Sequence, residues 1–177
     1  VLECVKENNC EGLIYASSSS VYGSNEKTPS SVTDSINNPI SIYAVTKIAN
    51  ELMAKTYSHL YGIHTTGLRF FTVYGPWGRP DMAMYIFAKK ILENKKIPVF
   101  NHGEMFRDFT YIDDIVGGIL SAITKNYKCE IFNLGNRNVV KIMDVIKIIE
   151  LYLKKNAQID FQNIPLGDIK KTSSDIT

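Results

Sequence analysis

The chain has 177 residues, 45% of them hydrophobic and 21% charged, so it can bury a core and is not disordered by composition. Its 20 basic and 18 acidic residues nearly cancel, which argues against a nucleic-acid partner or a membrane-surface patch. No apolar run approaches the ~18–20 residues that cross a bilayer, so no membrane partner is expected. Three cysteines and three histidines without metal-ligand spacing predict no metal site, and the cysteines favour a reducing, cytoplasmic compartment.

The first part of the sequence predicts two strands separated by a long helix. Residues 2–6 suggest the end of a helix, and residues 12–16 form a short apolar run that is typical of a buried parallel strand. Residues 41–61 contain no Gly or Pro and consist largely of good helix formers, and Gly62 follows them as a C-cap. Residues 64–71 predict the next strand.

The second part continues the alternation of helices and strands after a loop that contains several glycines and prolines. Helices are expected at 82–93, 113–123 and 141–154, and strands at 97–100, 130–134 and 158–161. Such alternation predicts an α/β fold with a parallel or mixed sheet.

Tyr43 and Lys47 are four residues apart in the long predicted helix, so they lie on one face of it, about one turn from each other. An ammonium group at that distance stabilises a phenolate, which allows a tyrosine to act as a general base on an alcohol. The spacing alone is weak evidence, because it occurs by chance on many helices.

Four consecutive serines, Ser17 to Ser20, directly follow the first predicted strand. Side chains at the carboxyl end of a strand in an open α/β sheet are where ligands bind. A polar loop capped by serines is the alternative. It accounts for the composition, but not for a buried strand before the serines and a Tyr-x-x-x-Lys helix after them.

The strand, the Ser-Ser-Ser-x-Val-Tyr-Gly loop and the Tyr-x-x-x-Lys helix together resemble the catalytic centre of extended short-chain dehydrogenases/reductases that act on nucleotide sugars. The resemblance implies a partial Rossmann-type parallel sheet with a small C-terminal substrate-binding lobe. It assigns residues 1–71 and 109–134 to the C-terminal part of the NAD-binding domain. Residues 72–108 and 135–177 then form a truncated lobe for the UDP-sugar.

The same resemblance assigns the catalytic and cofactor-binding residues. Ser18 is expected to be the catalytic hydroxyl, Tyr43 the base, and Lys47 its partner and a ligand of the nicotinamide ribose. Ser17, Ser18, Tyr43, Lys47 and Phe71 are expected to contact NAD. For Phe71, an ordinary place in the strand core is an equal alternative.

The resemblance also assigns the substrate-binding residues. Arg107 begins a segment similar to the one whose arginine holds the UDP diphosphate in the family, and Asp168 matches a residue that touches the uridine ribose. Pro165 departs from the family's pattern, so the nucleotide clamp can differ here. An ion pair between Arg107 and Asp108 is the alternative. The expected substrate-binding residues are Ser19, Ser20, Thr72, Arg79, Arg107 and Asp168.

The loop after the catalytic hydroxyl separates the reactions of the family. Sugar 4,6-dehydratases carry an Asp-Glu pair there and UDP-glucuronate decarboxylases a Glu, because those reactions need further proton carriers. Here the positions are Ser19 and Ser20, which do not titrate near neutrality. What remains is oxidation and re-reduction at one carbon, which requires only Tyr43, Lys47, Ser18 and bound NAD.

The loop 74–83 is most similar to that of UDP-glucuronate 4-epimerases. The expected function is therefore interconversion of UDP-glucuronate and UDP-galacturonate through a 4-keto intermediate, with Arg79 facing the sugar carboxylate. A surface ion pair of Arg79 with Asp81 remains an alternative. So does an epimerase that acts on UDP-glucose or UDP-N-acetylglucosamine.

The sequence lacks the Gly-x-x-Gly-x-x-Gly motif that follows a strand and cradles the NAD pyrophosphate at a helix N-terminus. We therefore expect about the C-terminal two-thirds of a longer polypeptide, inactive alone and unable to hold NAD tightly. A partner chain that supplies the rest, or a non-catalytic fragment, is the alternative. Without the missing segment, the strand at 13–16 would have an unpaired edge. The helix at 41–61 is expected to form a homodimer, as the corresponding helix does in relatives.

Overall fold

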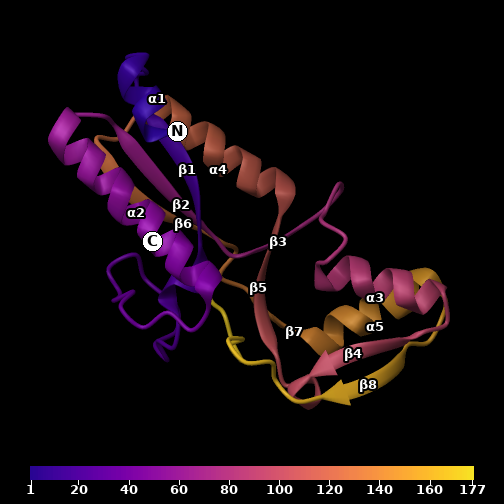
Figure 1. The fold of residues 1–177 in the computed structure, drawn as a ribbon. Coiled ribbons are helices and arrows are strands. Elements are labelled where there is room, and N and C mark those ends of the chain that lie inside the picture. Colours follow the sequence, from indigo (N-terminus) through magenta and orange to yellow (C-terminus); the bar gives the residue numbers. More distant parts are fainter.

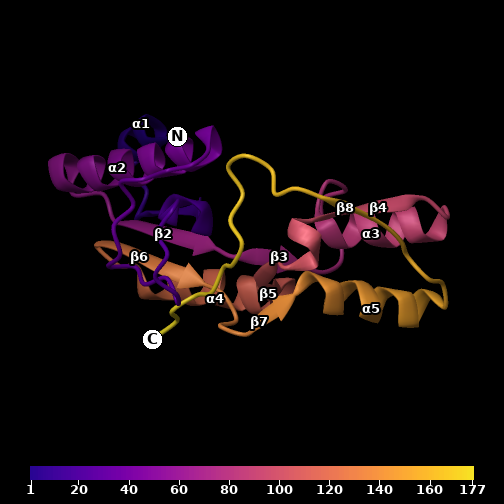
Figure 2. The ribbon, with the colours of Figure 1, turned by 90° about the horizontal axis from the view of Figure 1, so that it is seen from below.

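A computed structural model describes residues 1–177, and its first part is built on a parallel sheet of three strands in the order β1-β2-β6. Figure 1 shows this sheet with helix α2 beside it, and Figure 2 shows α2 and α4 on opposite faces of the sheet. The elements of this part are α1 (Leu2–Glu7), β1 (Leu13–Ser18), the 3-10 helix η1 (Ser19–Tyr22), α2 (Ile42–Tyr61), β2 (Thr65–Phe70), α4 (Ile112–Lys125) and β6 (Cys129–Leu134).

The second part is a lobe in which two helices pack against a two-stranded parallel sheet (Figure 1). A short mixed sheet in the order β3-β5-β7 lies between the lobe and the first sheet. The elements are β3 (Thr72–Tyr74), α3 (Ala83–Leu92), β4 (Lys96–Phe100), the 3-10 helix η2 (Asn101–Gly103), β5 (Phe106–Tyr111), β7 (Val139–Lys141), α5 (Ile142–Leu153) and β8 (Gln158–Gln162).

The larger hydrophobic core lies in the lobe. Helix α5 presents Ile142, Val145 and Ile146 to it, the i, i+3, i+4 pattern of an amphipathic helix. Ile97 and Val99 alternate along β4 and point the same way. The nine buried residues of this core are Phe87, Ile91, Ile97, Val99, Met105, Phe109, Ile142, Val145 and Ile146.

The C-terminal segment runs from β8 back to the first part (Figure 2). The Phe106 amide donates to the Lys170 carbonyl at 2.8 Å, and the Ser30 amide donates to the Ser173 carbonyl at 2.8 Å. The segment therefore connects the strand that leads into the lobe with the loop after η1.

A buried carboxylate fixes this segment. Asp108 is fully buried, and its oxygens accept the amides of Asn136 at 2.8 Å, Arg137 at 3.1 Å and Ser174 at 2.8 Å, and also the Ser174 hydroxyl at 2.5 Å. A Cβ atom on Gly135 would lie only 2.2 Å from that hydroxyl, so the position has room only for glycine. Asp108 is therefore the centre of a junction between β5, the loop after β6 and the C-terminal segment.

These elements confirm the predicted α/β class, and each predicted helix and strand is present. The expected start of the long helix is confirmed as well, since the Ser41 hydroxyl accepts the Ala44 amide at 3.1 Å as an N-cap. The expected division into two domains remains a prediction, because β5 extends across the boundary at residue 108. Strand β1 pairs with β2 on one edge only.

The structure contains no helix that is both long and apolar enough to cross a bilayer. It also brings no three His, Cys, Asp or Glu side chains together as a metal site.

Candidate active site

Tyr43 and Lys47 lie in the first turns of α2, where that helix faces the carboxyl end of β1. The Lys47 ammonium donates to the Ala16 carbonyl at 2.9 Å and lies 5.7 Å from the centre of the Tyr43 ring. Tyr43 is 54% exposed, so its hydroxyl is open to a ligand. The structure thus places the expected base and its cation side by side.

Ser18 ends β1 and is the N-cap of η1. Its Oγ accepts the Ser20 amide at 3.2 Å and the Ser20 hydroxyl at 2.8 Å. Both contacts use Ser18 as an acceptor, so its own proton is left for donation to another group. The backbone at Gly23, directly after η1, packs closely against the Asn38 carbonyl, because a Cβ atom on Gly23 would lie 1.9 Å from that oxygen.

A cavity of about 170 Å³ lies between this loop, the N-terminus of α2 and the C-terminal segment. Ser41, which caps α2, is also part of its wall. Five of the six expected substrate-binding residues line the cavity: Ser19, Ser20, Thr72, Arg107 and Asp168. The structure therefore brings these five together from four separate segments, although their role in binding stays a prediction.

Arg107 and Asp168 contact each other across this cavity. The Arg107 guanidinium donates to Asp168 Oδ1 at 2.7 Å and to the Lys170 carbonyl at 3.3 Å. Burial lowers the pKa of Arg107 below its ordinary value, and the Asp168 carboxylate opposes that change. The alternative pairing of Arg107 with Asp108 is wrong, because Asp108 is engaged in its buried junction.

Arg79 lies outside the cavity, on the exposed loop after β3. Its guanidinium pairs with the Asp81 carboxylate, and its side chain is 73% exposed. This surface ion pair is the alternative to a contact between Arg79 and the sugar carboxylate. Asp81 raises the pKa of Arg79 above its ordinary value, and Tyr43 adds a weaker effect in the same direction. The expected contact of Arg79 with the sugar carboxylate therefore stays a prediction.

Ser17 and Phe71 both have partners inside the protein. The Ser17 hydroxyl donates to the Glu51 carboxylate at 2.5 Å, and Ser17 is only 2% exposed. Phe71 packs against Val21 and Tyr22 in a small core cluster. Their expected contacts with NAD stay predictions.

Two charged residues beside the site were missed in the sequence. Glu51 of α2 and Arg69 of β2 are each 3% exposed at the side chain and form two hydrogen bonds of 2.8 and 2.9 Å. Burial by itself lowers the pKa of Arg69, but Glu51 and Tyr22 together outweigh it and the pKa is raised. A signal was present, since Glu51 continues the spacing of Tyr43 and Lys47 by four more residues.

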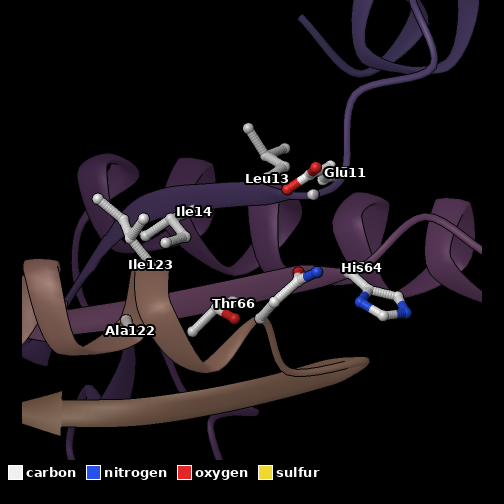
Figure 3. Close-up of a pocket in the computed structure, with 9 residues that line it drawn as sticks. Glu11, Leu13, Ile14, His64, Thr66, Ala122 and Ile123 are labelled. Carbon is white, nitrogen blue, oxygen red and sulfur yellow. The ribbon is translucent and has the colours of Figure 1, made fainter.

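A second cavity, of about 440 Å³, lies at the other end of β1 and β2 (Figure 3). Its wall includes Ile14 of β1, Thr66 of β2 and Ile123 of α4. None of the expected site residues lines it. The chemistry-bearing side chains gather instead at the carboxyl ends of the strands, which is where ligands bind in open α/β sheets.

The residues present fit one end of an NAD molecule. The Tyr43 hydroxyl and the Lys47 ammonium are polar groups on the open side of α2, suited to a ribose and a nicotinamide. The chain offers no glycine-rich turn at a helix N-terminus for the pyrophosphate.

This fold and this site define a class of protein. The chain belongs to the NAD dependent epimerase/dehydratase family, whose family model matches residues 1–135.

Several relatives match almost the whole chain. An uncharacterized protein of Methanocaldococcus jannaschii is 54% identical over 177 residues, covering 100% of this chain and 54% of the relative. UDP-glucuronate 4-epimerase 4 of Arabidopsis thaliana is 46% identical over 98% of this chain and 44% of its own length. The crystal structure of the UDP-glucuronic acid 4-epimerase of Bacillus cereus, in complex with UDP-glucuronic acid and NAD, superposes with a TM-score of 0.91 at 38% identity.

That superposition covers 99% of this chain and 56% of the Bacillus protein, so the chain spans about half the length of the relatives it matches. It confirms the Rossmann-type architecture that the sequence predicted.

Proposed function

We propose that the chain is the catalytic part of an NAD-dependent UDP-sugar 4-epimerase that interconverts UDP-glucuronate and UDP-galacturonate. One observation supports this most strongly. The Tyr43–Lys47 pair and Ser18 lie at the end of one strand, beside a cavity that contains Arg107. An alcohol-oxidising centre next to an anion-binding side chain suits a sugar joined to a diphosphate.

Each of the three residues has a defined task. Tyr43 acts as the phenolate that Lys47 stabilises: it takes the proton of the 4-hydroxyl, is a neutral phenol while the 4-keto sugar exists, and later returns the proton. Ser18 donates a hydrogen bond to the oxygen on carbon 4. When bound, NAD supplies the acceptor and donor of the carbon-bound hydrogen.

Epimerisation requires that the keto-sugar rotate between the oxidation and the re-reduction, so that the hydrogen returns to its opposite face. Arg107 holds the diphosphate by charge, so the nucleotide stays while the sugar rotates. Ser19 and Ser20 offer hydrogen bonds but no proton carrier, so water is not eliminated from the turning sugar.

The choice of a uronate substrate rests on similarity and on Arg79. The Arabidopsis and Bacillus relatives are described as acting on UDP-glucuronate or binding it. The test is to give UDP-glucuronate, UDP-glucose and UDP-N-acetylglucosamine separately to the holoenzyme. The holoenzyme is here this chain together with a segment that carries the pyrophosphate-binding glycines. Fastest turnover of UDP-glucuronate supports the proposal, and preference for a neutral sugar contradicts it.

Arg79→Ala is expected to reduce kcat/KM for UDP-glucuronate about 10–150-fold, the value of a hydrogen bond to a charged group. Activity on neutral UDP-sugars should change much less, because they carry no carboxylate. Lys95→Ala is the matched control, since Lys95 is another exposed, ion-paired cation. Equal losses on charged and neutral sugars would remove the carboxylate role of Arg79.

The homodimer is expected to form through α2. Its Tyr43 and Lys47 face the site, whereas Met53 and Leu60 are 47% and 60% exposed elsewhere on the helix. Sedimentation of the holoenzyme should give a dimer, and Met53→Lys with Leu60→Lys should give a monomer because buried charges oppose association. A parent that stays monomeric at micromolar concentration would show that α2 is not an interface.

A further inference from the structure

A chain of buried polar contacts runs behind the catalytic pair. The Ser17 hydroxyl donates to Glu51 Oε1 at 2.5 Å, and Arg69 donates to both oxygens of the same carboxylate at 2.9 and 2.8 Å. The Arg69 guanidinium also lies 4.9 Å from the centre of the Tyr22 ring. Apart from the expected contact of Ser17 with NAD, none of these groups has a part in the proposed reaction.

The contacts link two consecutive residues of β1 to two consecutive turns of α2. Lys47 reaches the Ala16 carbonyl, and four residues later in the helix Glu51 receives the Ser17 hydroxyl. The next residue of the strand is Ser18. Two links one turn apart fix both the position of α2 along the strand and its rotation about its own axis.

The ion pair makes the Glu51 link rigid. A two-point contact between a guanidinium and a carboxylate fixes the plane of the carboxylate as well as its position. Since Arg69 belongs to β2 and Ser17 to the neighbouring β1, Glu51 is held by both strands at once. Burial of both charges excludes the water that could substitute for a lost partner.

We infer that Glu51, held by Arg69, is a positioning residue that acts through Ser17 and Lys47 to set the geometry of Tyr43 against Ser18. This inference rests on the proposed function for its kinetic consequence, but not for its structural one. A simple contribution to stability is the competing explanation, because breaking a buried ion pair also destabilises a fold.

Three variants of the NAD-loaded holoenzyme separate these explanations. Ser17→Ala removes the link between strand and helix but leaves the ion pair intact. Glu51→Gln keeps the shape and removes the charge. Ser58→Ala is the control, because it removes another buried hydrogen bond of α2, to the Lys128 carbonyl at 3.1 Å, at the far end of the helix.

Ser17→Ala is expected to lower kcat about 10-fold while KM changes less than about twofold, the loss of one hydrogen bond to a charged group. Combining it with Glu51→Gln should add little to the loss caused by Glu51→Gln alone, because the two act as a unit. Ser58→Ala should lower the Tm without changing kcat. Equal values of kcat for Ser17→Ala and Ser58→Ala would overturn the inference.

A crystal structure of the Ser17→Ala holoenzyme gives the second readout, which needs no substrate. The contact between Lys47 Nζ and the Ala16 oxygen, 2.9 Å in the parent, is expected to be broken. If the parent turns over none of the three sugars while this contact is lost in the variant, the proposed function fails and the positioning role stands. A contact that persists unchanged overturns the positioning role, whatever the activity.

Discussion

Tyr43→Phe in the holoenzyme is expected to lower kcat for epimerisation about 10²–10⁴-fold, the usual contribution of a positioned acid–base group. The affinity for the UDP-sugar should stay within about threefold, because the change removes the proton carrier and not the residues that hold the diphosphate. Tyr43 is half exposed, so the loss of its hydroxyl leaves no buried group unpaired and the fold should persist. Product analysis and calorimetric binding check both parts.

Tyr85→Phe is the matched control for this result. Tyr85 is similarly exposed, at 48%, but lies on α3 in the lobe. It should keep the activity of the parent. Activity of Tyr43→Phe within about tenfold of the parent would contradict its role as the base.

Asp108→Ala is expected to have the largest effect on stability. It removes the acceptor of the Asn136 amide, the Ser174 amide and the Ser174 hydroxyl, around a carboxylate that is itself fully buried. Each buried group left unpaired costs roughly 1–3 kcal/mol, so a loss of at least about 3 kcal/mol in the free energy of unfolding is expected. Urea unfolding followed by circular dichroism measures it.

The control for this change is Asp160→Ala. Asp160 is exposed on β8 and receives only a side-chain contact from Gln162. The free energy of unfolding of the Asp160→Ala variant should differ from that of the parent by no more than about 0.5 kcal/mol. If both variants unfold at the same urea concentration, the junction around Asp108 contributes no more than a surface residue.

The long elements could be predicted because their signals are local. Residues 41–61 combine helix-forming composition with Gly62 as a C-cap, which the structure confirms, and the structure adds Ser41 as the N-cap. Strands β3 and β7 have only three residues each, which is too short for an alternating pattern to be recognised. The sequence of β5 predicts only a binding segment, because its place between β3 and β7 depends on partners distant in the sequence.

The site could be predicted in part for a similar reason. Tyr43 and Lys47 share one helix, so their proximity follows from spacing alone. The pairing of Arg107 with Asp168 joins residues 61 positions apart, and only the return of the C-terminal segment creates it. Glu51 was missed because a charged residue in a helix is usually solvated, and its buried partner lies on another element.

The central claim is that the chain's residues carry out oxidation and re-reduction at carbon 4 of a UDP-sugar. The most direct test gives the holoenzyme UDP-glucuronate labelled with deuterium at carbon 4 and follows both sugars by NMR. The account predicts UDP-galacturonate that keeps the deuterium at carbon 4, because the hydrogen leaves and returns without exchange with water. Deuterium lost to solvent, or found at another carbon, would contradict the account.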